Sequence, residues 1–233
     1  MLTNAQLIQV QEAAPEEGLS LLASWFPGAV SFSSSLGQED QVITDMIFRN
    51  DIPVEVFTID TGRLFNETYE LLEKTNARYQ KNMTVYFPDA VHVESYVKEH
   101  GINAFYGSAD LRKSCCHIRK VIPLNRALEG VKVWVTGLRA EQSGNRNNMP
   151  VIEWNEEKQL YKYNPLLKWS FEEMISYLGK YSVPYNVLHD RGFISIGCAP
   201  CTRAIEPGEE ARAGRWWWET SQKECGLHGE RKK

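Results

Sequence analysis

Residues 27–40 read PGAVSFSSSLGQED. The first six residues have the pattern of a short buried strand, and small hydroxyl residues follow them. Apolar side chains then recur at the spacing of a helix, at Val42, Ile43, Met46 and Ile47. The stretch therefore predicts a strand, a loop of small residues and a helix, in that order.

The loop between this strand and helix is a candidate anion site. Hydroxyl residues and a glycine at a helix N-terminus expose backbone N–H groups, and the helix dipole favours a negative ligand there. A serine-rich turn is also a common helix cap, so a capping role is an open alternative. The candidate phosphate-binding residues are Ser33, Ser34, Ser35 and Gly37.

Strand and helix patterns alternate on the C-terminal side of this unit. Strands are predicted at residues 54–59, 83–87 and 131–136, and helices at residues 67–79 and 91–99. This alternation predicts an α/β fold with a parallel sheet that helices cover on both faces. The other predicted elements are an amphipathic helix at 5–25 with a break near Pro15, a hairpin from 151–154 and 160–163, and a helix that starts at the capping box Ser170 and Glu173 and ends at Gly179.

Polar residues follow two of the predicted strands. Asp60, Thr61 and Gly62 come directly after the second strand, and Arg139 and Arg146 lie in the loop after residues 131–136. In an open parallel sheet, ligands bind at the carboxyl ends of the strands. Arginine side chains bind phosphate or sulfate through two parallel hydrogen bonds. Both segments are therefore candidate substrate contacts, although the first could also be a simple turn before a helix.

The sequence holds five cysteines. Cys198 and Cys201 form a Cys-x-x-Cys pair, the spacing that brings two thiolates to one side of a turn for a soft metal or an iron-sulfur cluster. Cys115 and Cys116 are the remaining pair and would supply two more ligands. Zinc sites are usually built from two spaced pairs, so an adjacent pair favours a cluster over zinc.

Cys225 is the cysteine left over from that set. A reactive cysteine needs positive neighbours that favour the thiolate, and Lys223 and His228 lie close to it in the sequence. The alternative is a tail cysteine without a role. The residues around Cys225 do not by themselves decide between the two.

Taken together, these motifs resemble one enzyme family. The segments are Cys115-Cys116, Cys198-x-x-Cys201, Gly214-Arg215-Trp216-Trp217-Trp218-Glu219 and Glu224-Cys225-Gly226-Leu227-His228. They resemble the thioredoxin-dependent assimilatory adenylyl-sulfate (APS) reductases, which are related to the reductases of 3'-phosphoadenylyl sulfate (PAPS). The serine loop likewise resembles the modified PP-loop of the ATP-pyrophosphatase superfamily, with Ser34 and Ser35 in place of two glycines.

The resemblance implies a PP-loop fold at residues 1–210 and a mobile catalytic tail at residues 211–233. It implies a 4Fe-4S cluster on the four paired cysteines, and a tail cysteine, Cys225, that attacks the sulfur of APS to give an S-sulfocysteine. Thioredoxin would then release sulfite, in sulfate assimilation. The substrate contacts that it implies are Ser33, Ser34, Ser35, Gly37, Asp60, Thr61, Gly62, Lys120, Arg139, Arg146, Arg212, Arg215 and His228.

Some alternatives stay open within this reading. PAPS, or both nucleotides, could be the substrate, and the oligomeric state is undecided, a homo-oligomer included. Outside the family, the motifs would also suit an ATP-consuming PP-loop ligase or an iron-sulfur or zinc regulatory module. The serine substitutions in the loop argue against the ligase. The tryptophans at 216–218 cannot all point to one side of a regular element, so we expect them to pack the tail.

Composition limits the class of protein. The chain has 233 residues, 42% hydrophobic and 24% charged, which fits one globular domain with a good core. A formal net charge of -4 does not suggest nucleic acid or a membrane surface as a partner. Without a long apolar run or a basic N-terminal leader pattern, and with cysteines reserved for a cluster and a nucleophile, the expected location is the reducing cytoplasm.

Overall fold

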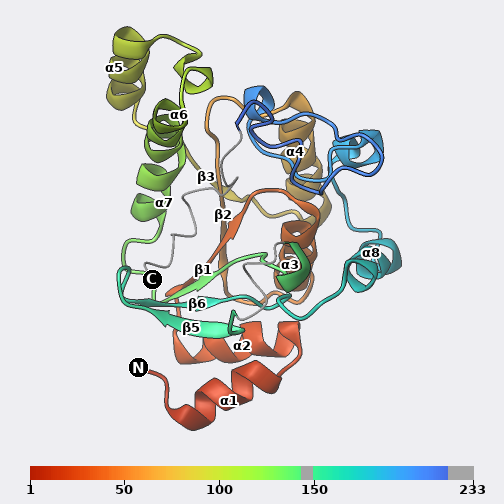
Figure 1. Ribbon diagram of the computed structural model, residues 1–233. Coiled ribbons are helices and arrows are strands. Elements are labelled where there is room, and N and C mark those ends of the chain that lie inside the picture. Colours follow the sequence, from red (N-terminus) through yellow and green to blue (C-terminus); the bar gives the residue numbers. More distant parts are fainter. Residues whose placement is uncertain (143–148, 220–233) are drawn as a thin grey trace. The chain divides into compact units, whose positions relative to one another are not determined.

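The computed structural model describes residues 1–142 and 149–219 (Figure 1). Its contacts divide the chain into two compact units. The first unit comprises Met1–Thr58, Glu70–Thr84 and Gly130–Asn186, and the second comprises Ile59–Tyr69, Val85–Glu129 and Val187–Lys233. The expected boundary at residue 210 stays a prediction, because most of the segment beyond it lies outside the described residues.

The described residues form a six-stranded sheet with the strand order β3-β2-β1-β4-β6-β5. β1 pairs in parallel with β2 and with β4, β4 pairs in parallel with β6, and β5 runs antiparallel to β6 as the edge strand. The predicted parallel α/β sheet is therefore confirmed, with the predicted hairpin as its antiparallel edge. The strands are β1 Val30–Ser34, β2 Glu55–Ile59, β3 Thr84–Tyr86, β4 Val133–Val135, β5 Ile152–Asn155 and β6 Leu160–Tyr163.

One face of this sheet carries the core of the first unit. Phe32, Val135 and Tyr163 are paired in register across β1, β4 and β6, so their side chains lie on the same face, and they are at most 1% exposed. Five helices of the described chain pack apolar residues into this core. They are α1 Asn4–Glu12, α2 Pro15–Trp25, α3 Gln38–Arg49, α4 Asn66–Tyr79 and α8 Phe171–Lys180.

The helix boundaries follow local signals in the sequence. The N-terminal helical pattern breaks between α1 and α2, where Pro15 opens the second helix, as predicted. α8 begins with the predicted capping box, since the Ser170 hydroxyl accepts from the Glu173 N–H and the Glu173 carboxylate accepts from the Ser170 N–H. α4 spans Asn66–Tyr79 and also matches its predicted range.

The second unit is mainly helical. Its helices are α5 Ala90–His100, α6 Ala109–Cys116 and α7 Ile122–Ala127, with a π-helical turn, His117–Val121, between the last two. A short 3-10 turn, Ala199–Cys201, follows Cys198. Cys115 and Cys116 lie in the last turn of α6.

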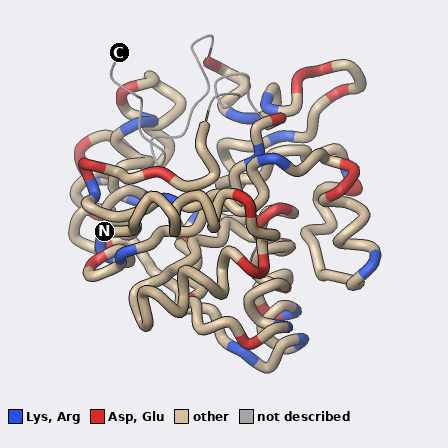
Figure 2. Tube along the Cα trace, turned by 90° about the horizontal axis from the view of Figure 1, so that it is seen from below, with Lys and Arg blue, Asp and Glu red and all other residues tan. Residues whose placement is uncertain are grey.

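Charged residues of both signs are interspersed along the described chain (Figure 2), in keeping with the small net charge of -4. None of the helices within residues 1–142 and 149–219 combines the length and apolar character that a membrane span requires.

Candidate functional site

In the first unit, the serine loop is shorter than the sequence predicts. β1 runs two residues beyond the predicted end at Phe32, because Ser33 and Ser34 pair in register with β2. The Ser33 hydroxyl accepts a hydrogen bond from Trp134 Nε1 at 2.8 Å, and the Ser34 hydroxyl accepts one from the Leu36 N–H at 3.1 Å. Two of the three candidate hydroxyls therefore hold the fold around the turn, and Leu36 adopts a left-handed φ of 61° within it.

Ser35, the third hydroxyl, is held by a residue that sequence patterns did not single out. Asp40 Oδ2 accepts from the Ser35 N–H at 2.5 Å and from the Ser35 hydroxyl at 2.6 Å. Asp40 is 7% exposed, and its burial raises the pKa of the carboxyl to about 7 despite these two hydrogen bonds. The side chain packs against Gly137, where an added Cβ would lie 1.9 Å from Asp40 Oδ1. Glycine is therefore required at position 137 by close approach.

Gly37 is the N-cap residue of α3 and provides no side-chain cap. The first N–H groups of the helix have no acceptor within the helix, which makes this end a place where an anion can bind. Glu39 lies in the first turn and would oppose an anion, but Arg139 donates Nε to its carboxylate at 2.9 Å. The pairing of Glu39 with Arg139 therefore reduces the negative charge at the helix end.

Arg139 was predicted as a direct anion contact. Its guanidinium also donates from Nη1 to Glu141 at 2.8 Å, and the residue is only 5% exposed. In the structure, the side chain thus binds two carboxylates of its own unit. A direct contact with substrate would require it to exchange at least one of them, so this assignment stays a prediction.

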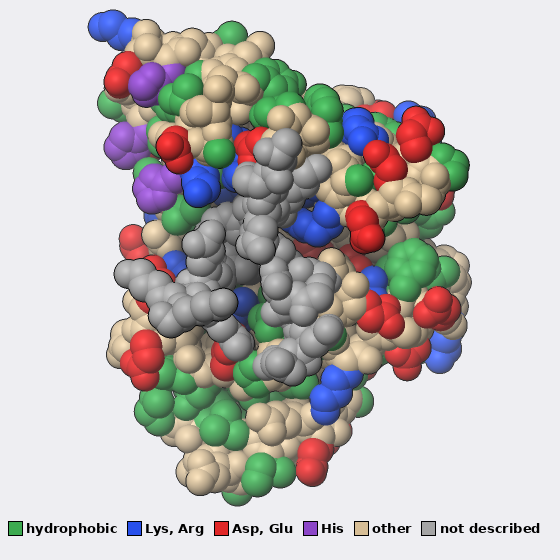
Figure 3. Space-filling model, viewed as in Figure 1, with side chains coloured by type: hydrophobic (Ala, Val, Ile, Leu, Met, Phe, Trp, Pro, Cys, Tyr) green, Lys and Arg blue, Asp and Glu red, His purple; other side chains and the backbone are tan. Residues whose placement is uncertain are grey.

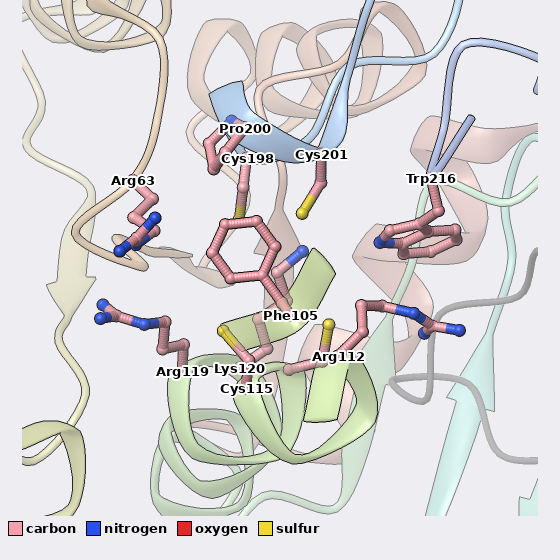
Figure 4. A pocket seen from close by; sticks show the side chains of 11 residues that line it. Arg63, Phe105, Arg112, Cys115, Arg119, Lys120, Cys198, Pro200, Cys201 and Trp216 are labelled. Atoms are coloured by element: carbon pink, nitrogen blue, oxygen red, sulfur yellow. The ribbon is translucent and has the colours of Figure 1, made fainter. Parts of the chain in front are cut away.

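In the second unit, the four paired cysteines line one pocket (Figure 4). Cys115 rises from α6, and Cys198 and Cys201 descend from the turn opposite, so that these labelled sulfurs point toward one another. All four are free thiols. The lining residues are Arg63, Phe105, Arg112, Cys115, Cys116, Arg119, Lys120, Cys198, Pro200, Cys201 and Trp216.

Backbone hydrogen bonds fix the Cys-x-x-Cys turn. The Ala199 N–H donates to the Arg63 carbonyl at 2.8 Å, and the Cys201 N–H donates to the Cys198 carbonyl at 2.9 Å. The Thr202 hydroxyl donates to the same Cys198 carbonyl at 3.0 Å. The two thiols are therefore presented by a rigid turn, as a cluster or metal site needs.

The pKa values of Cys198 and Cys201 differ because the surroundings of the two thiols differ. Burial raises the pKa of Cys201 to about 12, and the charge of Cys198 adds to this. Burial also acts on Cys198, but Lys120, the Thr61 hydroxyl and Arg215 outweigh it, so the pKa of Cys198 is lowered. Cys198 is consequently the thiol of this pair that its neighbours help to ionise.

The Asp-Thr-Gly segment supports this pocket. Asp60 Oδ1 accepts from the Gly62 N–H at 2.7 Å, which closes a tight turn. The Thr61 hydroxyl lies 3.3 Å from Cys198 Sγ, and its carbonyl accepts from Arg119 Nη1 at 2.6 Å. The contact of these residues with adenosine stays a prediction. In the structure, the segment contacts Cys198 and Arg119 of the cysteine pocket.

Several cations meet at the cysteine pocket. The family resemblance implied Lys120, which does line it, but not Arg63, Arg112 and Arg119, which line it as well (Figure 4). Positive side chains near thiolates offset the negative charge that a thiolate-bound cluster carries. The missed arginines are distributed over residues 63–119, and no spacing rule identifies such a set. Their one available signal was the position of Arg112 and Arg119 within four residues of the cysteine pair.

Arg215 lies beside the pocket as part of the last described segment. It is 6% exposed, and its Nη1 donates to the Ser195 hydroxyl at 3.3 Å and to the Ile196 carbonyl at 3.2 Å. An added Cβ at Gly197 would lie 2.3 Å from Arg215 Nη2, so glycine is needed there for the guanidinium to pass. The carbonyl of Arg212 accepts from the Arg215 N–H at 3.0 Å. Arg212 and Arg215, both predicted as anion contacts, thus belong to one turn of the second unit.

The tryptophan triplet packs as predicted. Trp216 is 1% exposed and adopts a left-handed φ of 43°, whereas its neighbour Trp217 is 40% exposed. Trp218 packs with the core cluster formed by Phe105, Trp216 and the Cys-x-x-Cys pair. The side chains therefore point to different sides and anchor this segment to the pocket.

Three predicted site residues, Arg146, Cys225 and His228, lie outside the described residues.

Histidine side chains gather at the surface near α5, which carries His92 and His100 (Figure 3). Within residues 1–142 and 149–219, however, no group of three or more His, Cys, Asp or Glu side chains is arranged to hold a single metal ion.

Comparison with known proteins gives consistent matches. Residues 29–204 match the "Phosphoadenosine phosphosulfate reductase domain" family. An "Adenosine 5'-phosphosulfate reductase" from Allochromatium vinosum is 48% identical over 222 residues, which cover 95% of this chain and 86% of the relative. One from Burkholderia cepacia is 51% identical over 200 residues, which cover 85% of this chain and 80% of the relative.

A solved structure also matches the fold. The crystal structure of phosphoadenylyl-sulfate (PAPS) reductase from Candida auris, in a phosphate complex, superposes with a TM-score of 0.72 at 31% sequence identity. The match covers 88% of this chain and 98% of that one.

Proposed function

Because the chain belongs to the phosphoadenosine phosphosulfate reductase family, we propose that this oxidoreductase reduces adenylyl sulfate to sulfite and AMP in sulfate assimilation, with thioredoxin as the electron donor. The observation that carries the proposal is the pocket on which Cys115, Cys116, Cys198 and Cys201 converge. The relatives with which the chain shares 48–51% identity over most of its length are adenosine 5'-phosphosulfate reductases. The chemistry needs reduced thiols, so we place the protein in the cytoplasm.

We assign a 4Fe-4S cluster to the four pocket cysteines. The donor set fits such a cluster, because four cysteine side chains line one space and iron-sulfur clusters are held by cysteine thiolates. When bound, the cluster would link α6 to the Cys-x-x-Cys turn and act electrostatically through Lys120. The surrounding arginines and the Thr61 hydroxyl are suitable outer partners for thiolate ligands.

The reacting thiol in the proposal is Cys225. Its thiolate attacks the sulfur of adenylyl sulfate, a bond forms between the two sulfurs, and the bond from that sulfur to the phosphate oxygen breaks. AMP leaves, and Cys225 carries a sulfonate. A thiolate of reduced thioredoxin then attacks the Cys225 sulfur and releases sulfite, and the second thioredoxin thiol closes a disulfide and returns Cys225 as a thiol. The dithiol thus supplies both electrons, and two protons are released.

The proposed anion contacts are those that the family resemblance implies. They are Ser33, Ser34, Ser35, Gly37, Lys120, Arg139, Arg146, Arg212, Arg215 and His228. Asp60, Thr61 and Gly62 are proposed to receive the adenosine part. Donors and cations aimed at the leaving phosphate and at the sulfonate are most effective where water is excluded.

PAPS is the alternative substrate, and one observation favours it: the solved structure with 31% identity is a phosphoadenylyl-sulfate reductase. Initial rates of sulfite release, measured with reduced thioredoxin and either nucleotide, separate the alternatives. We expect a higher kcat/KM with adenylyl sulfate than with PAPS. A higher value with PAPS would establish the alternative, and no sulfite from either nucleotide would refute the proposed function.

A further inference from the structure

Arg112 has a partner that neither the cysteine motif nor the proposed chemistry explains. Arg112 lies in α6 one turn before Cys116 and is 2% exposed. Its guanidinium carbon lies 4.5 Å from the centre of the Trp216 ring, and Arg112 lines the same pocket as Cys116. A buried cation thus forms part of the wall of the cysteine pocket and contacts the tryptophan segment.

Glu219 is the partner of this buried cation. Arg112 Nε donates to Glu219 Oε1 at 2.8 Å, and Arg112 Nη2 donates to Glu219 Oε2 at 2.9 Å. The two side chains are 3% and 6% exposed. Such a two-pronged contact fixes both position and orientation, and removing one partner would leave a charge buried without compensation.

Glu219 is also the last described residue before the segment that carries Cys225. Its N–H donates to the Trp216 carbonyl at 2.9 Å, and the Trp216 N–H donates to the Cys201 carbonyl at 3.2 Å. The end of the described chain is therefore fastened to the pocket by its backbone and by its side chain. Cys225 follows six residues later in the sequence, so it can lie at most about 20 Å from Glu219.

We propose that Arg112 and Glu219 are positioning residues: their ion pair fixes the root of the C-terminal segment to the wall of the cysteine pocket and thereby sets where Cys225 can act. This inference rests on the proposed function of Cys225. Because Arg112 lines the cysteine pocket and binds Glu219, the pair also makes the position of the root depend on the integrity of the pocket. Neither residue touches the reacting atoms in this proposal.

The central variant is Glu219→Gln, which keeps the side-chain shape and removes the charge. Its matched control is Glu209→Gln. Glu209 also forms a two-pronged pair, with Arg203 at 2.7 and 2.8 Å in the same unit, but those side chains are 32% and 35% exposed. Exposed pairs contribute little, so the control should behave like the unaltered protein.

The first measurement is proteolysis by trypsin, which does not depend on the proposed enzymatic activity. Trypsin cleaves after arginine, and Arg215 is buried in the unaltered protein, so native-state cleavage after Arg215 reports release of the root. We expect Glu219→Gln to raise this cleavage rate at least about tenfold. A rate equal to that of the Glu209→Gln control would overturn the proposed anchor.

The second readout is catalysis by cluster-loaded protein. We expect Glu219→Gln to lower kcat at least about tenfold while KM for adenylyl sulfate changes less than about twofold, with iron and sulfide contents preserved. An unchanged kcat, or a loss that follows loss of iron, would overturn the positioning role. If the unaltered protein itself releases no sulfite, the proposed function fails, and the cleavage assay alone decides whether the anchor exists.

A double-mutant cycle that combines Glu219→Gln with Arg112→Met tests whether the two residues act together or separately. If the pair acts as one unit, the cleavage rate of the double variant will not exceed that of the worse single variant. Additive effects of the two substitutions would contradict the proposed pairing.

Discussion

Replacing Asp40 with asparagine keeps the shape of the side chain and removes its charge. In the structure, Asp40 holds Ser35 through two hydrogen bonds and is 7% exposed. Burial raises its pKa from 3.8 to about 7, and the neighbouring charge of Glu39 acts in the same direction. The substitution therefore tests whether a buried carboxyl beside the serine loop takes up a proton on folding.

The sign of the effect follows from this higher folded pKa. Between pH 3.8 and about 7 the folded protein binds more protons at Asp40 than the unfolded chain does, so the contribution to stability is present below this range and is lost as the pH rises through it. At about 1.4 kcal/mol for each pKa unit, the total is about 4 kcal/mol. About 2 to 3 kcal/mol of that lies between pH 5 and pH 8.

Urea unfolding at several pH values from 5 to 8 measures this contribution. We expect the free energy of unfolding of the unaltered protein, relative to that of Asp40→Asn, to fall by about 2 to 3 kcal/mol across the range. Asp51→Asn is the matched control, because the Asp51 side chain is 85% exposed and should give a small and nearly constant difference. A difference for Asp40→Asn that stays constant within about 0.5 kcal/mol would refute the reasoning.

Other substitutions test the packing and the thiol assignments. Gly137→Ala should destabilise the protein by about 1 to 3 kcal/mol in urea unfolding, because the new Cβ would lie 1.9 Å from Asp40 Oδ1. Gly179→Ala, where a Cβ meets nothing within 4 Å in α8, should be neutral or stabilising, and equal losses at both positions would contradict the packing argument. Cys116→Ser should lower the iron and acid-labile sulfide content of anaerobically purified protein, while Cys225→Ser should retain both and lose sulfite formation. Retention of iron and sulfide in Cys116→Ser would remove that residue from the cluster.

Elements that depend on neighbouring residues could be predicted from the sequence. The capping box at Ser170, the break at Pro15 and the hairpin at 151–163 are local patterns, and the structure contains each of them. The convergence of the cysteine pairs also followed from their number, because a site for a cluster needs four ligands. Strand ends were less certain, since Ser33 and Ser34 resemble loop residues by composition and yet pair with β2.

Features that depend on distant side chains could not be predicted. Arg112 and Glu219 are 107 residues apart, and their pairing becomes visible only when α6 and the tryptophan segment pack together. By its sequence position, Asp40 is an acid in the first turn of a helix. In the structure, Gly137, which follows β4, packs against the Asp40 side chain, and Asp40 is only 7% exposed. Burial of this kind is set by packing and leaves no pattern in the nearby sequence.

The most direct test of the proposed chemistry is anaerobic incubation of the purified, cluster-loaded protein with adenylyl sulfate in the absence of reductant, followed by intact and peptide mass analysis. The account predicts a sulfonate adduct confined to the peptide that contains Cys225, and release of that adduct as sulfite when reduced thioredoxin is added. Protein with intact iron and sulfide that forms no adduct on Cys225 would contradict it.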